Sequence, residues 1–140
     1  MRKIMIVDDN YLSAEGIEKN IDWEVLNAEI VHICYNGTSA IEAMKNEPVD
    51  LIISDIEMPD LDGISMSRQA LDINPMVKII LISAYDKFEY ARRALLLGAL
   101  DYIEKPLDYA YLIQKVKNAF ALMEREQKNL QLLKQSQAFA

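Results

Sequence analysis

Residues 51–55 read Leu-Ile-Ile-Ser-Asp, and residues 78–83 read Lys-Ile-Ile-Leu-Ile-Ser. Both stretches contain an uninterrupted apolar run, and both end in polar residues. Runs of this kind are typical of strands that are buried on both faces, because helices cover both sides of a parallel sheet. The two stretches therefore predict central strands of such a sheet.

Strand-like and helix-like segments alternate along the rest of the chain. Short β-branched runs occur at 3–7, 29–34, 51–54, 78–82 and 102–103, and helical spacing occurs at 12–20, 38–45, 64–71, 88–97 and from 109 onward. This alternation indicates right-handed βαβ crossovers. We predict a doubly wound α/β domain with helices on both faces of a five-stranded parallel sheet. The expected strand order is 2-1-3-4-5, as in flavodoxin-like folds.

Local signals predict where the helices start and stop. We expect Thr38 to cap the helix that follows Gly37, Asp86 to cap the helix at 88–97, and Asp108 to cap the last helix. Gly98 is expected to end the helix at 88–97.

The last helix is longer than a sheet requires. Its spacing continues from 108 to about 137, which at about 1.5 Å per residue is about 45 Å. Glu126 and Gln127 interrupt its apolar seam. We expect residues 1–122 to form the domain and 123–140 a helical extension. Two interpretations of the extension stay open. It is a solvated tail, or it is a linker or dimerisation helix that leads to an output domain.

The composition restricts the possible partners. The chain has 140 residues, of which 15 are basic and 22 acidic, with a net charge of −7. One domain of this charge is not expected to bind DNA by itself, because it cannot neutralise phosphates. Cys34 is the single cysteine, and no apolar run reaches the about 18 residues of a membrane helix. We therefore expect a cytoplasmic protein with no membrane association.

Polar residues follow the predicted strands at their carboxyl ends. They are Asp8 and Asp9 after the first strand, Asp55 after the third, Ser83 after the fourth and Lys105 after the fifth. In the order 2-1-3-4-5, the first and third strands are neighbours at the switch point, where open α/β sheets bind ligands. We expect these side chains to form one site.

This combination of groups indicates a type of chemistry. Three clustered carboxylates repel one another unless a cation shares the site, and Mg²⁺ prefers oxygen ligands of this kind. A carboxylate nucleophile, a metal, a hydroxyl and an ammonium suit phosphoryl transfer through an aspartyl-phosphate. The sequence has no glycine-rich phosphate cradle, so we do not expect a bound nucleotide as the donor.

Over about the first 120 positions, the chain resembles the receiver domain of two-component response regulators. Asp55 within residues 55–63, Asp-Ile-Glu-Met-Pro-Asp-Leu-Asp-Gly, resembles the phosphoacceptor motif. Asp8 and Asp9 resemble the acidic pair, and Lys105 with Pro106 resembles the lysine and cis-proline.

The resemblance implies a role for each of these residues. Asp55 would accept a phosphoryl group from the phosphohistidine of a sensor histidine kinase. Asp9 and Asp55 would ligate Mg²⁺ directly, and Asp8 would ligate it through water. The backbone carbonyl of Glu57 would complete the protein's ligands, and Lys105 would pair with the phosphate.

Ser83 and Tyr102 resemble the family's switch residues. Ser83 would donate a hydrogen bond to the phosphate, and Tyr102 would rotate inward as Ser83 moves. By the same resemblance, the output surface lies on the fourth helix, the fifth strand and the fifth helix. We expect a homodimer through this surface.

Residues 21–24, Ile-Asp-Trp-Glu, and 83–91, Ser-Ala-Tyr-Asp-Lys-Phe-Glu-Tyr-Ala, resemble receivers that precede an AraC-type DNA-binding domain. The resemblance implies a transcription regulator that reaches DNA only through an output domain absent from this chain. It also implies a signalling module rather than an enzyme. The only reactions that such a module would catalyse are its own phosphorylation from small donors and its own dephosphorylation. The alternatives are a stand-alone receiver that acts by protein contacts and an aspartyl-phosphate hydrolase of the haloacid dehalogenase type.

Glu57 adds a carboxylate two residues after the expected acceptor. A negative charge there would either tighten metal binding or oppose an incoming phosphoryl group. Our hypothesis is that Glu57 shifts the affinity for Mg²⁺.

Overall fold

The computed structural model describes residues 1–84 and 88–138. Its strands are β1 (Arg2–Val7), β2 (Ala28–Cys34), β3 (Leu51–Asp55), β4 (Lys78–Ser83) and β5 (Asp101–Glu104). Its helices are α1 (Tyr11–Asn20), α2 (Gly37–Asn46), α3 (Gly63–Ile73), α4 (Phe88–Leu97) and α5 (Tyr109–Ala138). The predicted cap at Asp86 lies outside the described residues.

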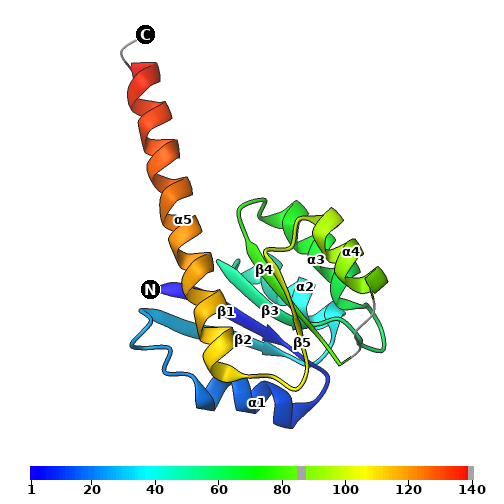
Figure 1. The fold of residues 1–140 in the computed structure, drawn as a ribbon. Coiled ribbons are helices and arrows are strands. Elements are labelled where there is room, and N and C mark those ends of the chain that lie inside the picture. Colours follow the sequence, from blue (N-terminus) through cyan, green and yellow to red (C-terminus); the bar gives the residue numbers. More distant parts are fainter. Residues whose placement is uncertain (85–87, 139–140) are drawn as a thin grey trace.

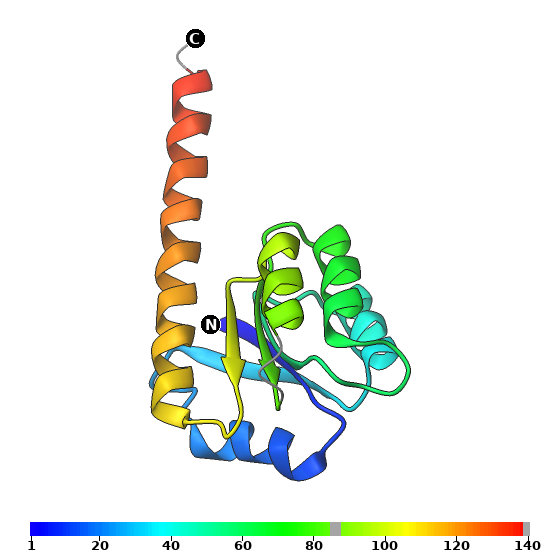
Figure 2. The ribbon, with the colours of Figure 1, turned by 45° about the vertical axis from the view of Figure 1, so that its right-hand side comes forward.

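The strands form one parallel sheet in the order β2-β1-β3-β4-β5, as the sequence predicts. Helices α1 and α5 cover one face, and α2, α3 and α4 cover the other (Figures 1 and 2). The doubly wound α/β prediction is therefore confirmed. The core forms two layers because successive strand residues point to opposite faces.

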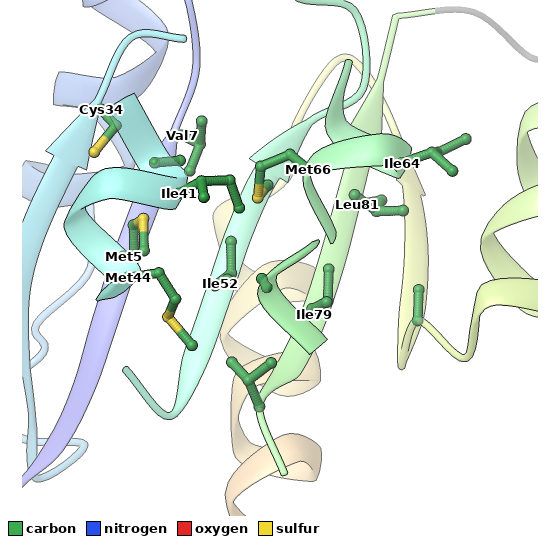
Figure 3. Packing of buried hydrophobic residues seen from close by; sticks show 14 of the residues in the cluster. Met5, Val7, Cys34, Ile41, Met44, Ile52, Ile64, Met66, Ile79 and Leu81 are labelled. Carbon is green, nitrogen blue, oxygen red and sulfur yellow. The ribbon is translucent and has the colours of Figure 1, made fainter. Parts of the chain in front are cut away.

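The three inner strands β1, β3 and β4 contain continuous apolar runs, and those runs are buried on both faces of the sheet. Ile4 and Ile6 of β1 face the layer under α1 and α5, whereas Met5 faces the layer under α2 and α3. Figure 3 shows this second layer, with Met44 of α2 and Ile52 of β3 in the same cluster. Burial of a side chain of this size stabilises the fold by about 1.5–3 kcal/mol.

The helix ends match the sequence signals, with one exception. Gly98 follows α4 with a φ of 94°, a conformation that glycine adopts readily, and Asp108 accepts a hydrogen bond from the backbone N–H of Ala110. The predicted cap at Thr38 is wrong, because α2 begins earlier. Its cap is Asn36, whose side chain accepts a hydrogen bond from Ser39 N at 2.8 Å.

Helix α5 extends well beyond the sheet (Figures 1 and 2). Its packed residues continue to Met123, and Glu126 pairs with Lys78 at the start of β4 at 2.8 Å. Leu130 and Leu133 follow on the helix and are 47% and 59% exposed. Across the described ranges, no helix is both long enough and apolar enough to span a membrane. The boundary expected after residue 122 stays a prediction.

Candidate functional site

Three carboxylates meet where β1 and β3 end. The register pairs Val7 with Ser54, so Asp8 and Asp55 leave neighbouring strands side by side. One oxygen from each of Asp8, Asp9 and Asp55 lies within 4.8 Å of the others. Asp8 and Asp55 are buried, whereas Asp9 is exposed at the mouth of the cluster. The sheet thus brings together the predicted acidic residues.

Lys105 reaches the same cluster from β5. Its Nζ lies 3.2 Å from an oxygen of Asp55 and 3.9 Å from an oxygen of Asp8. Its backbone N–H donates to the carbonyl of Ser83 at 2.8 Å, which ties the chain after β5 to the end of β4. The peptide bond between Lys105 and Pro106 is cis, as the resemblance implies.

The carboxyl group of Asp8 has a pKa above its ordinary value. Burial is the main cause that raises the pKa of Asp8 to about 6, and the charges of Asp55 and Asp9 raise it further. The hydrogen bond from Asn10 N and the charge of Lys105 lower the pKa but do not offset the burial. A cation shared by the three carboxylates would favour their ionised forms. The donor atoms are all oxygens, so the residues fit a hard divalent cation such as Mg²⁺.

Gly63 lets the loop after Asp55 fold tightly under the site. Its N–H donates to the carbonyl of Ile56 at 2.7 Å, and a Cβ at position 63 would meet the backbone of Asp55 and Ile56. Sequence reasoning assigned no role to Gly63. A glycine that begins a helix directly after an acidic loop is the signal for such a close approach.

Asp60 and Asp62 hold the same loop from outside. Asp62 caps α3 and accepts a hydrogen bond from Ser65 N at 2.8 Å. Asp60 accepts from the backbone N–H groups of Gly37 and Thr38, at the start of α2. Hydrogen bonding, chiefly from the Thr38 side chain, lowers the pKa of Asp60 to about 2. The loop that carries the acceptor motif is thereby fastened to two helices.

The two predicted switch residues, Ser83 and Tyr102, lie in different surroundings. Ser83 is completely buried at the end of β4, next to Ile82, whose partner across the ladder is Asp55. It lies at the same sheet edge as the carboxylates. Tyr102 lies within the edge strand β5, opposite Leu81, and is only partly buried. Tyr102 therefore does not belong to the carboxylate cluster.

An open pocket of about 510 Å³ adjoins the carboxylates. Asp9 and Glu57 line one part of it, and Tyr90 and Arg93 of α4 line another. The Glu57 side chain is exposed. Residues 85–87, which belong to the AraC-like stretch, lie outside the described ranges.

The family model for the response regulator receiver domain matches residues 4–117. The chain belongs to this family. Receiver domains are signalling modules that interact with histidine kinases. The matched residues include the carboxylate cluster, Lys105 and all of the sheet except the first two residues of β1.

The receiver is similar to longer regulators. An uncharacterized transcriptional regulatory protein of Bacillus subtilis, YesN, is 29% identical over 90% of this chain and 34% of its own length. The receiver spans 34–44% of the length of the first curated relatives that it matches.

Two solved structures are informative neighbours of the receiver. A two component transcriptional regulator AraC from Clostridium phytofermentans is 29% identical, with a TM-score of 0.81 over 92% of this chain and 99% of that one. The CheX-CheY-BeF₃-Mg²⁺ complex from Borrelia burgdorferi is 28% identical, with a TM-score of 0.75 over 85% of this chain and 89% of that one.

Proposed function

We propose that Asp55 is the phosphoacceptor of this receiver and takes its phosphoryl group from the phosphohistidine of a sensor histidine kinase. The observation that carries the proposal is the contact of 3.2 Å between Lys105 Nζ and Asp55. It places a cation on a carboxylate that already has two acidic neighbours within 4.8 Å. The proposed product is an aspartyl-phosphate that biases the output surface.

The proposed metal ligands are Asp9 and Asp55 directly, Asp8 through water, and the backbone carbonyl of Glu57. Mg²⁺ bound there would supply charge neutralisation on the phosphoryl oxygens. The Borrelia complex, which contains Mg²⁺ and the phosphoryl mimic BeF₃, supports this assignment by similarity.

The proposed chemistry of the protein groups follows from their positions. The ionised carboxylate of Asp55 attacks phosphorus in line with the leaving nitrogen of the phosphohistidine. The ammonium of Lys105 pairs with the transferred group and replaces the contact that it makes with Asp55. The hydroxyl of Ser83, at the same sheet edge, donates a hydrogen bond to a phosphoryl oxygen.

The proposed output begins at Ser83 and Tyr102. As Ser83 moves toward the phosphoryl group, Tyr102 rotates inward and changes the surface formed by α4, β5 and α5. Homodimerisation through this surface is the proposed consequence. Tyr102 already packs against the layer under α4, which supports its coupling to that helix.

The proposed complete protein is a cytoplasmic transcription regulator. Its AraC-type DNA-binding domain would follow the extension at 123–140, and DNA would bind only there. Similarity to the AraC regulator of C. phytofermentans supports this output. The receiver itself would perform no turnover beyond self-phosphorylation from small donors and self-dephosphorylation. A stand-alone receiver that acts by protein contacts is the alternative.

Acetyl phosphate tests the phosphoacceptor directly. The receiver incubated with acetyl phosphate and Mg²⁺ should gain the mass of one phosphoryl group, and Asp55→Asn should abolish the gain. Asp72→Asn is the matched control, because Asp72 is an exposed carboxylate on α3. An unmodified wild-type chain contradicts the proposal, and rapid phosphate release by a chain that stays unmodified supports a hydrolase instead.

Glu57 is the proposed modifier of metal affinity. Its exposed carboxylate lines the pocket that also contains Asp9, so its charge acts on a cation bound at the cluster. Calorimetric titration with Mg²⁺ should give different dissociation constants for the wild type and Glu57→Gln. Glu42→Gln, on the surface of α2, is the control. Equal constants for Glu57→Gln and the wild type would refute the hypothesis.

A further inference from the structure

The pocket beside the carboxylates has opposite charges in different parts of its wall. Asp9 and Glu57 line it near the cluster, and Arg93 lines it from α4. Arg93 is the single basic residue among the described residues of the lining, and it is half-buried. Met58 and Ile64 contribute apolar surface to the same wall. An anion that enters the pocket therefore meets a guanidinium as well as carboxylates.

Arg93 differs from its neighbour Arg92 in its surroundings. The guanidinium of Arg92 lies 3.6 Å from Glu89, and both side chains are well exposed. Within residues 1–84 and 88–138, Arg93 has no ion-pair partner. A guanidinium in a partly dehydrated wall that forms no ion pair with the described residues can bind an anionic ligand, and its planar fork matches a carboxylate.

We propose that Arg93 binds the acyl group of an acyl phosphate, on which a carboxylate forms as the bond to phosphorus breaks, and that this makes acyl phosphates the preferred small donors of this receiver. The inference rests on the proposed function of Asp55. In-line transfer places the leaving group on the side of phosphorus opposite Asp55. Lys105 contacts Asp55 and would serve the phosphoryl side, whereas Arg93 lines the pocket that adjoins the cluster and would serve the leaving group.

The transfer is balanced without any further reactant. A carboxylate oxygen of Asp55 forms a bond to phosphorus, and the bond between phosphorus and the acyl oxygen breaks. The electron pair leaves with the acyl oxygen as a free carboxylate, and no proton moves. Negative charge thus develops on the leaving group, where a guanidinium stabilises it. Phosphoramidate releases ammonia instead, so it offers Arg93 no carboxylate.

Donor preference is the experimental signature of this role. The rate of phosphorylation of the full chain, with Mg²⁺, is measured by intact mass with acetyl phosphate and with phosphoramidate. We expect Arg93→Gln to slow the reaction with acetyl phosphate by about tenfold or more, from the loss of a charged hydrogen bond. The rate with phosphoramidate should not change. Arg93→Lys should restore part of the rate, and the control Arg92→Gln should react like the wild type with both donors.

The other outcomes separate this inference from the proposed function. Equal slowing of both donors by Arg93→Gln, or slowing of neither, overturns the role of Arg93. Phosphorylation of Asp55 by phosphoramidate but not by acetyl phosphate overturns it as well, while the phosphoacceptor assignment stands. If neither donor modifies Asp55 in the unmutated chain, both proposals fail.

Discussion

Replacing Gly63 by alanine tests how closely the acceptor loop, residues 56–62 between β3 and α3, packs against the end of β3. The new Cβ would lie 2.9 Å from Ile56 Cα and 3.1 Å from the carbonyl carbon of Asp55, and closer still to the carbonyl oxygen of Asp55. Ordinary contacts begin at 3.4 Å, so the backbone must separate by at least about 0.5 Å. That movement also weakens the hydrogen bond of 2.7 Å from Gly63 N to Ile56 O.

The expected cost follows from these two effects. Overpacking in a dense interior costs about 1–3 kcal/mol, and a lost backbone hydrogen bond costs about 1 kcal/mol. We expect Gly63→Ala to lower the free energy of unfolding by about 3 kcal/mol, which for a domain of this size lowers Tm by about 10 °C. The rate of phosphorylation by acetyl phosphate should fall too, because the displaced backbone carries Asp55.

Gly16→Ala is the matched control. A Cβ at position 16 would meet the hydroxyl end of the Tyr109 side chain, which can move away. Alanine is also the better helix former, by about 1 kcal/mol. Thermal unfolding followed by circular dichroism should therefore show Gly16→Ala within about 3 °C of the wild type. Equal Tm values for the two variants would show that the acceptor loop has room for a side chain and would refute the reasoning.

Three further predictions concern a buried thiol, the packing of α5 and a hydrogen-bonded carboxylate. Burial raises the pKa of the Cys34 thiol, so a thiol reagent at pH 8 should modify the native protein far more slowly than the protein in denaturant; equal rates would contradict the burial. Met123→Ala should cost about 2–5 kcal/mol in urea unfolding because Met123 is 6% exposed, whereas Leu133→Ala should stay within about 0.5 kcal/mol, and similar losses would contradict the described packing. The lowered pKa of Asp60 means that its contribution to stability is present above about pH 4 and is lost as the pH falls toward 2. Asp60→Asn should accordingly destabilise the protein at pH 6 and less so at pH 3, and an equal effect at both values would count against the hydrogen bonds at the start of α2.

The sequence predicts the sheet well because each strand is specified locally. Continuous apolar runs such as Ile79–Ile82 have few alternatives to a doubly buried strand, and the polar residue after each run then falls at one edge. The position of the candidate site follows from these polar residues, because they all lie where the parallel strands end. This is why Asp8, Asp55 and Lys105 are found together, although Lys105 is 50 residues from Asp55 in the chain.

Features decided by contacts distant in sequence could not be predicted. Asn36 and Thr38 are both good capping residues, and the start of α2 depends on Asp60, which lies 22 residues from Thr38. Glu126 interrupts the apolar seam of α5 when the sequence is read alone. In the fold it pairs with Lys78, 48 residues away, at the sheet end where β4 begins.

The ion pair between Lys78 and Glu126 connects the start of β4 to the place where α5 leaves the domain. The strand has Ser83 at the end near the carboxylate cluster and Lys78 at the opposite end, where α5 is held. Beyond Glu126 the helix runs free for 12 residues to Ala138, which is about 18 Å. A tilt of about 10° at this pivot would move the helix tip by about 3 Å. A rigid helix that leaves the domain at this point would enlarge a small shift of the sheet into a larger movement of the helix tip.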